Sequence, residues 1–412
     1  MDTRKISLFM AGFIVMLFMT ACKSQIAQEK TQDSMEVGNE TIQASQNNFS
    51  FDLFKNMLAS DSEKINRLLS PQSIFMDLAM LYNGAHGTTQ TAMQKALRIN
   101  QINPERLNQS QAELLKNIPN LDEEVSFVMA NAIWHRNDLL PKSEFLTINQ
   151  TFYDAEIHAA DFRNLQTVEA INNWVNTKTS GKIPTLIESI SPGEVLFLLN
   201  AIYFKASWTH TFNPNHTRDM DFYTANGNIK TDFMFKDTRF NYLENENSQM
   251  IELPYGKGDF SMFVLLPSKN QSVTDLANSL NHQKFSQLLS AMETTSVKLY
   301  LPKWEVSYSA DNLIENLSDM GMKVAFKNQA DFSGLFKSES TKISQVKHKA
   351  YIKVDEEGTE AAAATGIGMV TTSMPMPSNI EMKVDRPFLY LIMEKNSGTI
   401  LFLGTIENPA VD

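Results

Sequence analysis

The feature that most constrains this chain is its continuity. From Phe49 to the end of the 412 residues, no stretch rich in proline, glycine or serine is long enough to separate domains, and no internal repeat is present. A single unit of about 360 residues exceeds the usual size of a domain. Because the only cysteine is Cys22, no intramolecular disulfide can form, and packing alone must stabilise the core.

Hydrophobic spacing within this unit predicts both helices and buried strands. Ser70-Pro71 is typical of a helix start, and Gly84 is expected to end that helix. Between them, apolar residues recur at helical spacing: Ile74, Phe75, Leu78, Ala79, Leu81 and Tyr82. Short apolar runs predict buried strands at residues 197–199, 262–266, 297–301, 388–393 and 400–403.

The order of these elements indicates the fold class. Asn396-Ser397-Gly398 supplies turn residues between the last two predicted strands, so we expect them to pair as a hairpin. Helices and strands do not alternate regularly along the chain. An α+β fold with mixed sheets is therefore expected.

Charge and motif content narrow the function. The formal net charge of −11 leaves no basic excess to displace counterions from phosphates, so no nucleic-acid partner is expected. The sequence has no Gly-x-Ser-x-Gly, no His-Glu-x-x-His and no phosphate-binding loop, and it has no second cysteine for a metal or redox pair. We therefore expect no enzyme activity, no metal and no other cofactor.

The N-terminal segment is typical of a processing signal. Arg4 and Lys5 precede an apolar run at residues 8–19, and Thr20-Ala21-Cys22 resembles a bacterial lipoprotein cleavage site. We expect residues 1–21 to be a signal peptide and Cys22 to carry lipid that binds a membrane. The alternative is an ordinary signal peptide, with Cys22 incidental.

The next segment predicts a tether. Residues 22–47 are polar and predict a flexible linker before a domain at residues 48–412. The mature protein is expected to be an exported lipoprotein, periplasmic or on the cell surface, with release to the extracellular space as the alternative.

Residues 358–378 form a long run of small residues that is poised between structures. Four alanines favour a helix, whereas Gly366, Gly368 and the β-branched residues that follow oppose one. As a strand, one face would hold Thr359, Ala361, Ala363, Thr365, Ile367 and Met369, and the other Glu360, Ala362, Ala364, Gly366 and Gly368. The first face carries no charge, so the segment could enter a sheet; the alternative is a plain surface loop.

Five motifs in order resemble those of the serpin family. Along the chain they are Ser70-Pro71-Gln72-Ser73-Ile74, residues 171–175 with 179–183, residues 200–208, residues 356–365, and Asp385-Arg386-Pro387-Phe388. Residues 356–365 resemble the hinge of inhibitory serpins. The resemblance runs from about Phe49 to Pro409. It implies a metastable, monomeric inhibitor with an exposed reactive loop at residues 358–382.

The family resemblance also implies a mechanism. A target protease attacks the loop and forms a covalent acyl-enzyme, and insertion of residues 358–369 into the main sheet traps it. The residues that map onto the hinge are Glu357, Gly358, Thr359, Glu360, Ala361, Ala362, Ala363 and Ala364. The alternative is a non-inhibitory serpin that acts as a binding or carrier protein, which tends to have bulky or charged hinge residues.

Further residues follow from the same resemblance. Ser70, Ser73, Asn200 and His348 map onto the shutter, the polar cluster that controls opening of the sheet. Taken alone, His348 would be interpreted as a core histidine with a backbone partner. Two interpretations of Trp208 stay open. It is either a gate over the breach, the point where the loop enters the sheet, or a residue that only packs in the core.

The reactive bond is expected at Thr372-Ser373, by the spacing usual in the family. Residues 358–382 contain no lysine or arginine, so elastase-like or subtilisin-like targets are expected, rather than trypsin-like ones. Cysteine proteases also form acyl-enzymes and stay open as targets. Residues 104–119 offer only Arg106 and Lys116, so no heparin-like cofactor is expected.

Overall fold

A computed structural model describes residues 42–61, 63–337, 341–359 and 380–411. Its main sheet has six strands in the order β10-β11-β12-β4-β2-β3. Their bounds are β10 Trp304–Ala310, β11 His348–Val354, β12 Gly358–Thr359, β4 Leu196–Ser207, β2 Val125–Arg136 and β3 Glu156–Ala160. The β2–β3 pair is parallel and the other pairs are antiparallel, so the sheet is mixed.

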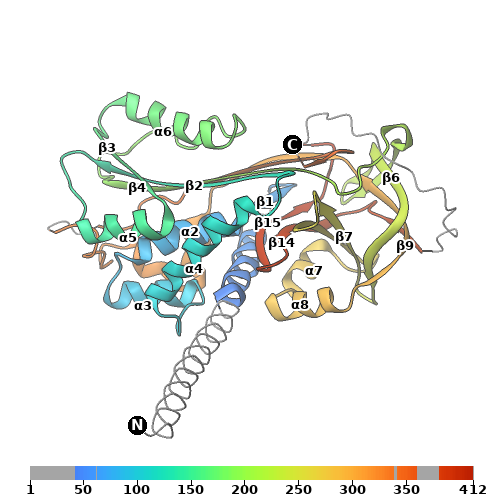
Figure 1. Ribbon diagram of the computed structural model, residues 1–412, viewed down its shortest axis with the longest axis horizontal. Helices are drawn as coiled ribbons and strands as arrows, with labels where there is room; N and C mark the ends of the chain where they lie inside the picture. Colours follow the sequence, from blue (N-terminus) through green and yellow to red (C-terminus); the bar gives the residue numbers. More distant parts are fainter. Residues whose placement is uncertain (1–41, 62, 338–340, 360–379, 412) are drawn as a thin grey trace, which may run out of the picture.

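A second sheet has nine strands and lies at one end of the molecule (Figure 1). Eight strands follow the order β1-β15-β14-β8-β7-β6-β9-β13, and β5 pairs with β6. The bounds are β1 Arg67–Leu69, β5 Arg218–Thr224, β6 Gly227–Glu244, β7 Ser248–Tyr255, β8 Phe260–Pro267, β9 Glu293–Pro302, β13 Ile380–Lys383, β14 Phe388–Glu394 and β15 Thr399–Ile406. β7, β8, β14 and β15 carry almost wholly buried side chains and form the centre of the core.

Helices cover both faces of the main sheet. Helix α6 (Leu165–Lys178) lies on one face, and α2 (Pro71–Tyr82), α3 (Gly87–Ala96), α4 (Pro104–Asn117) and α5 (Ser143–Tyr153) lie on the other (Figure 1). Further helices are α7 Val273–Ser279, α8 His282–Ser290, α9 Leu313–Leu317 and a helix at residues 42–60, with short turns at η1 Ile118–Asn120, η2 Pro214–His216, η3 Ser318–Met322 and η4 Lys323–Phe326. Within the described residues, no helix is long and apolar enough to cross a bilayer.

The predicted elements are present. Ser70 caps α2 by accepting a hydrogen bond from the Ser73 backbone N–H, Pro71 begins the helix, and it ends two residues before Gly84. β14 and β15 pair as the antiparallel hairpin that Asn396-Ser397-Gly398 predicted. The five apolar runs lie in β4, β8, β9, β14 and β15.

The domain begins earlier than predicted. Residues 42–60 form a helix, so residues 42–47 belong to the fold and not to the predicted tether at 22–47. The Gln43 and Asn47 side-chain amides each donate to the Gly398 carbonyl at 2.8 Å, and Ile42 is buried. The polar composition of residues 42–47 suggested a tether, whereas these side chains donate hydrogen bonds to the carbonyl of a distant hairpin turn.

Candidate functional site

The main sheet contains one strand position at which the described residues place a strand of two residues, β12. β12 pairs with β4 on one side, Thr359 facing Ala206, and with β11 on the other, Thr359 facing Val354. In the described part of the chain, β4 and β11 are joined only through β12. Gly358 and Thr359, two predicted hinge residues, thus begin a strand between β4 and β11.

A tight turn leads the chain into this position. The Asp355 N–H donates to the Gly358 carbonyl at 3.0 Å, and the Asp355 carboxylate accepts from the Glu357 N–H at 3.0 Å. The Trp208 N–H donates to the Glu357 carbonyl at 2.8 Å. The turn therefore reverses the chain directly after β11 and fixes its register on β4.

Trp208 packs over the point where β12 enters. Its ring stacks on Tyr255 with centroids 4.4 Å apart, and its Nε1–H donates to the Asp355 carbonyl at 2.9 Å. Tyr255 in turn shares a hydrogen bond with the Thr359 hydroxyl. We call Trp208, Tyr255, Asp355, Gly358 and Thr359 the upper site. Trp208 is both packed and in contact with the first residues of the hinge.

Gly358 is required by close contact with β4. A Cβ at this position would lie 2.0 Å from the Ala206 carbonyl oxygen and 2.7 Å from Ser207 Cα. These are backbone atoms in the middle of a sheet, which cannot move aside as a flexible side chain would. Only glycine lets the chain enter here without displacing β4.

The predicted shutter residues lie beside the same strand position. The Ser70 N–H donates to His348 Nε2 at 3.0 Å, and the Ser70 hydroxyl accepts from the Ser73 N–H at 3.4 Å. His348 therefore has the backbone partner expected of a core histidine, and that partner is a shutter residue. Asn200 makes its side-chain bond elsewhere, donating to Asn131 Oδ1 of β2 at 2.7 Å.

The His348 ring predicts a pH dependence. Because Nε2 accepts a hydrogen bond, the ring is neutral, and burial lowers the pKa of His348 to about 4. This pKa lies below the ordinary value of about 6.5, which the unfolded chain keeps. The protein therefore has its full free energy of unfolding above pH 6.5 and loses part of it as the pH falls towards 4, because only the unfolded chain binds the proton. We expect the free energy of unfolding to drop by about 3 kcal/mol over that range on account of this group. Urea unfolding of the wild type and of His348→Gln at several pH values checks this, and an unchanged slope in the variant would contradict it.

Asn200 also connects to a residue that the sequence reasoning missed. Its backbone N–H donates to the carboxyl group of Asp77, on helix α2, and burial raises the pKa of Asp77 to about 8. A carboxyl group within an apolar run, between Met76 and Leu78, was the signal that could have identified Asp77. The alternation that begins with the Trp208–Glu357 hydrogen bond also directs the Asn200 N–H away from β2, towards the strand position that β12 begins.

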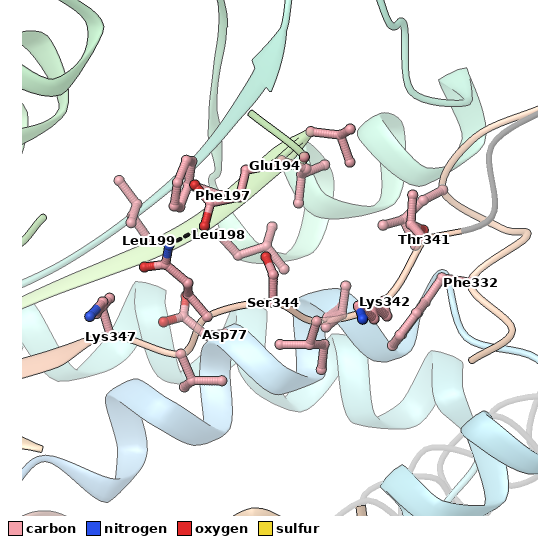
Figure 2. Close-up of a pocket in the computed structure, with 18 of the residues that line it drawn as sticks. Asp77, Glu194, Phe197, Leu198, Leu199, Phe332, Thr341, Lys342, Ser344 and Lys347 are labelled. Atoms are coloured by element: carbon pink, nitrogen blue, oxygen red, sulfur yellow. Dashed lines mark hydrogen bonds between the residues drawn. The ribbon is translucent and has the colours of Figure 1, made fainter. Parts of the chain in front are cut away.

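A cavity of 540 Å³, which we call the sheet cavity, lies further along the same strand position, beyond Asn200 and His348. Residues 193–199, which lead into and begin β4, form one wall, and residues 341–347, which lead into β11, form the other. Asp77, Leu78 and Leu81 of α2 line it from the helical side. Figure 2 shows Asp77 opposite Leu198 and Leu199, with Ser344 and Lys347 on the second wall. The cavity thus lies between the two strands that an inserted strand would join.

Several predicted residues lie outside the described part of the chain. These are hinge residues Glu360, Ala361, Ala362, Ala363 and Ala364, the predicted reactive bond Thr372-Ser373, and Cys22. Among the described residues, no group of three or more histidine, cysteine, aspartate or glutamate side chains could hold a metal ion. The candidate site therefore consists of the upper site, the shutter residues and the sheet cavity.

In the described residues, helices flank both faces of a mixed sheet in which only Gly358 and Thr359 join β4 to β11. The family model described as serpin (serine protease inhibitor) matches residues 44–409. The chain belongs to the serpin family, and its α+β fold is the serpin fold. Members of this family are protease inhibitors rather than enzymes, and they act on target proteases.

Relatives and solved structures agree with this assignment. A serpin-like protein of Thermococcus kodakarensis is 35% identical over 371 residues, covering 88% of this chain and 84% of the relative. The thermophilic serpin tengpin in its native state superimposes with a TM-score of 0.81 at 36% identity, covering 89% of this chain and 93% of tengpin. Human thyroxine-binding globulin in complex with thyroxine gives 0.81 at 27% identity, covering 90% and 99%. The serpin fold is thus shared by this chain and by a thyroxine-binding globulin.

Proposed function

We propose that this serpin is a suicide-substrate inhibitor of proteases. One observation carries the proposal: in the described residues only Gly358 and Thr359 join β4 to β11, and the sheet cavity separates the segments that lead into these two strands. A protease that cleaves the loop frees the chain after Thr359 to extend this strand. Insertion then drags the covalently bound enzyme along the sheet before its acyl bond is hydrolysed.

Charge and size of the loop residues support insertion. Thr359 is buried on the core side of the sheet, so the alternate residues Ala361, Ala363, Thr365, Ile367 and Met369 would follow it on that side, all of them uncharged. Roughly a dozen new backbone hydrogen bonds at about 0.5–1.5 kcal/mol each would stabilise the inserted state by on the order of 10 kcal/mol. That gain is comparable with the stability of a whole domain.

The residues of the loop also support a class of target. No lysine or arginine occurs in residues 358–382, so a protease pocket with a buried carboxylate would find no partner charge. We propose Thr372-Ser373 as the reactive bond and elastase-like or subtilisin-like enzymes as targets. The shutter residues and Trp208 are proposed to control how readily the sheet opens.

Loop cleavage tests this function directly. A protease that cuts within residues 360–379 and is then inactivated should leave a cleaved protein that unfolds at a much higher temperature than the intact one, because the inserted strand adds on the order of 10 kcal/mol. Thermal unfolding followed by circular dichroism measures the difference. An unchanged unfolding temperature would contradict inhibition by insertion and would favour a binding or carrier role.

Export and lipid anchoring form a separate part of the proposal. The apolar run at residues 8–19 and the Thr20-Ala21-Cys22 sequence support cleavage before Cys22 and lipidation of its thiol and amino group. Cys22→Ala should abolish incorporation of radiolabelled palmitate and release the protein from the membrane fraction. Labelling that persists in the variant would contradict the anchor.

The folded domain is proposed to act as a monomer.

A further inference from the structure

The two strands that flank β12 each predict where the later loop residues would lie. Gly358 pairs with Ser207 and Thr359 with Ala206 on β4, and the Trp208–Glu357 hydrogen bond continues this register. Extended residue by residue, the register places residue 365 opposite Asn200. On the other side, Thr359 pairs with Val354 of β11, and the same extension places residue 365 opposite His348. The two independent registers agree on one position, between two predicted shutter residues.

Alternation along a strand also predicts which face residue 365 would occupy. Thr359 is 1% exposed and contacts Tyr255 on the core face, and residue 365, six positions further, would point the same way. Ile202, Phe204 and Ala206 of β4 belong to that core, whereas Phe197, Leu199 and Ala201 pack with helix α6. The Thr365 side chain would therefore enter on the side of helix α2.

Asp77 is the polar group of α2 that this position meets. It borders the sheet cavity, which accounts for its partial exposure, and its carboxyl group accepts from the Asn200 N–H. Its Oδ1 is buried and has no hydrogen-bond partner among the described residues. An unsatisfied buried oxygen costs free energy that a further donor could recover.

We propose that Asp77 is the receptor for the Thr365 hydroxyl when the loop is inserted. The inference rests on the proposed function, because Thr365 reaches this position only by insertion. On insertion, the carbonyl of residue 365 accepts the Asn200 N–H, as the antiparallel pairing requires. The Asp77 carboxyl group loses this donor and accepts a hydrogen bond from the Thr365 hydroxyl instead. The carboxyl group thus keeps one donor when it gives up the Asn200 N–H, and the shutter exchanges one hydrogen-bond arrangement for another.

The protonation state of Asp77 supports this exchange. With a pKa of about 8, the carboxyl group is mostly protonated at neutral pH and brings no charge into the sheet. A protonated carboxyl group can both donate to and accept from a hydroxyl. Asp77 is thus a positioning residue: it touches the inserted strand and not the protease.

A double-mutant cycle, measured in the intact and in the loop-cleaved full chain, tests the pairing. Thr365→Val keeps the shape of the side chain and removes the hydroxyl; Asp77→Leu removes the receptor. In the cleaved wild-type background, Thr365→Val should lower the guanidinium midpoint, and in the Asp77→Leu background this shift should disappear or reverse. In the intact protein, Thr365→Val should leave the midpoint unchanged in both backgrounds.

Controls separate this inference from the function on which it rests. Gln72→Leu also removes a buried polar group from α2, but Gln72 does not border the cavity, so the Thr365→Val shift should persist there. An equal shift with and without Asp77 would overturn the pairing and assign the hydroxyl to another acceptor, such as the unpartnered Asn200 Oδ1. If cleavage of the wild type gives no rise in midpoint, the proposed function fails and the inference fails with it.

A second measurement needs no change at Asp77, so it stands even if Asp77→Leu does not fold. Infrared difference spectra of the cleaved minus the intact protein should show a shift of a buried protonated carboxyl C=O band in the wild type. The shift should be absent or different in Thr365→Val. Identical difference spectra for the two proteins would overturn the proposal.

Discussion

Replacing Thr359 with arginine should convert the protein from an inhibitor into a substrate. Thr359 is 1% exposed and lies against Tyr255, under the stacked Trp208. An arginine can avoid this buried position in the intact protein only by leaving β12, and insertion of the loop would bury its guanidinium again without a partner charge, which costs several kcal/mol. Insertion would then be slower than hydrolysis of the acyl-enzyme. Titration of a target protease should show loss of inhibition, and denaturing gels should show cleaved protein without a covalent complex.

The neighbouring residue supplies a matched control. Glu360 would follow Thr359 on the opposite face of the inserted strand, so Glu360→Arg introduces the same side chain without burying it in the core. We expect Glu360→Arg to keep inhibiting, and Thr359→Val to do the same. Full inhibition by Thr359→Arg would show that the core face of the strand position is not the route of insertion.

Replacing Trp208 with alanine should have the second largest effect. Trp208 is 4% exposed, stacks on Tyr255, packs edge-on against Phe212 and donates to the Asp355 carbonyl. Loss of a buried tryptophan typically costs about 3–5 kcal/mol. Because these contacts hold the turn at the entry of β12, we also expect the intact protein to lose inhibitory activity faster on storage at moderate temperature, through insertion of the uncleaved loop.

A substitution in the second sheet separates the two effects of Trp208→Ala. Phe263 of β8 is 2% exposed and packs edge-on against Phe285 of α8. Phe263→Ala should lower the free energy of unfolding by a similar amount without speeding the loss of activity. Equal rates of activity loss in the two variants would assign Trp208 to packing alone.

Local sequence patterns predicted the elements that depend on local interactions. The cap of α2 requires only Ser70 and Pro71 beside an apolar stripe, and the β14–β15 hairpin requires only a short turn between two apolar runs. The unbroken length predicted one large unit. The order of strands in the two sheets was not predicted, because it joins segments far apart in the sequence.

Contacts between distant segments explain why the sequence did not predict the burial of Gln43 and Asn47 or the role of Asp77. Gln43 and Asn47 are polar, and their burial depends on the Gly398 carbonyl, more than 350 residues away in the chain. Asp77 gains its role from the Asn200 amide and from a cavity between two strands that follow it by more than a hundred residues. Neither burial pattern follows from the composition of the segment in which the residue lies.

Complex formation tests the central claim most directly. The purified protein is mixed with an elastase-type serine protease, the products are separated on a denaturing gel, and any released carboxyl-terminal peptide is sequenced. The account predicts a covalent complex that survives denaturation and a peptide that begins at Ser373. Complete cleavage without complex, by both elastase-type and subtilisin-type enzymes, and without a gain in thermal stability, would contradict it.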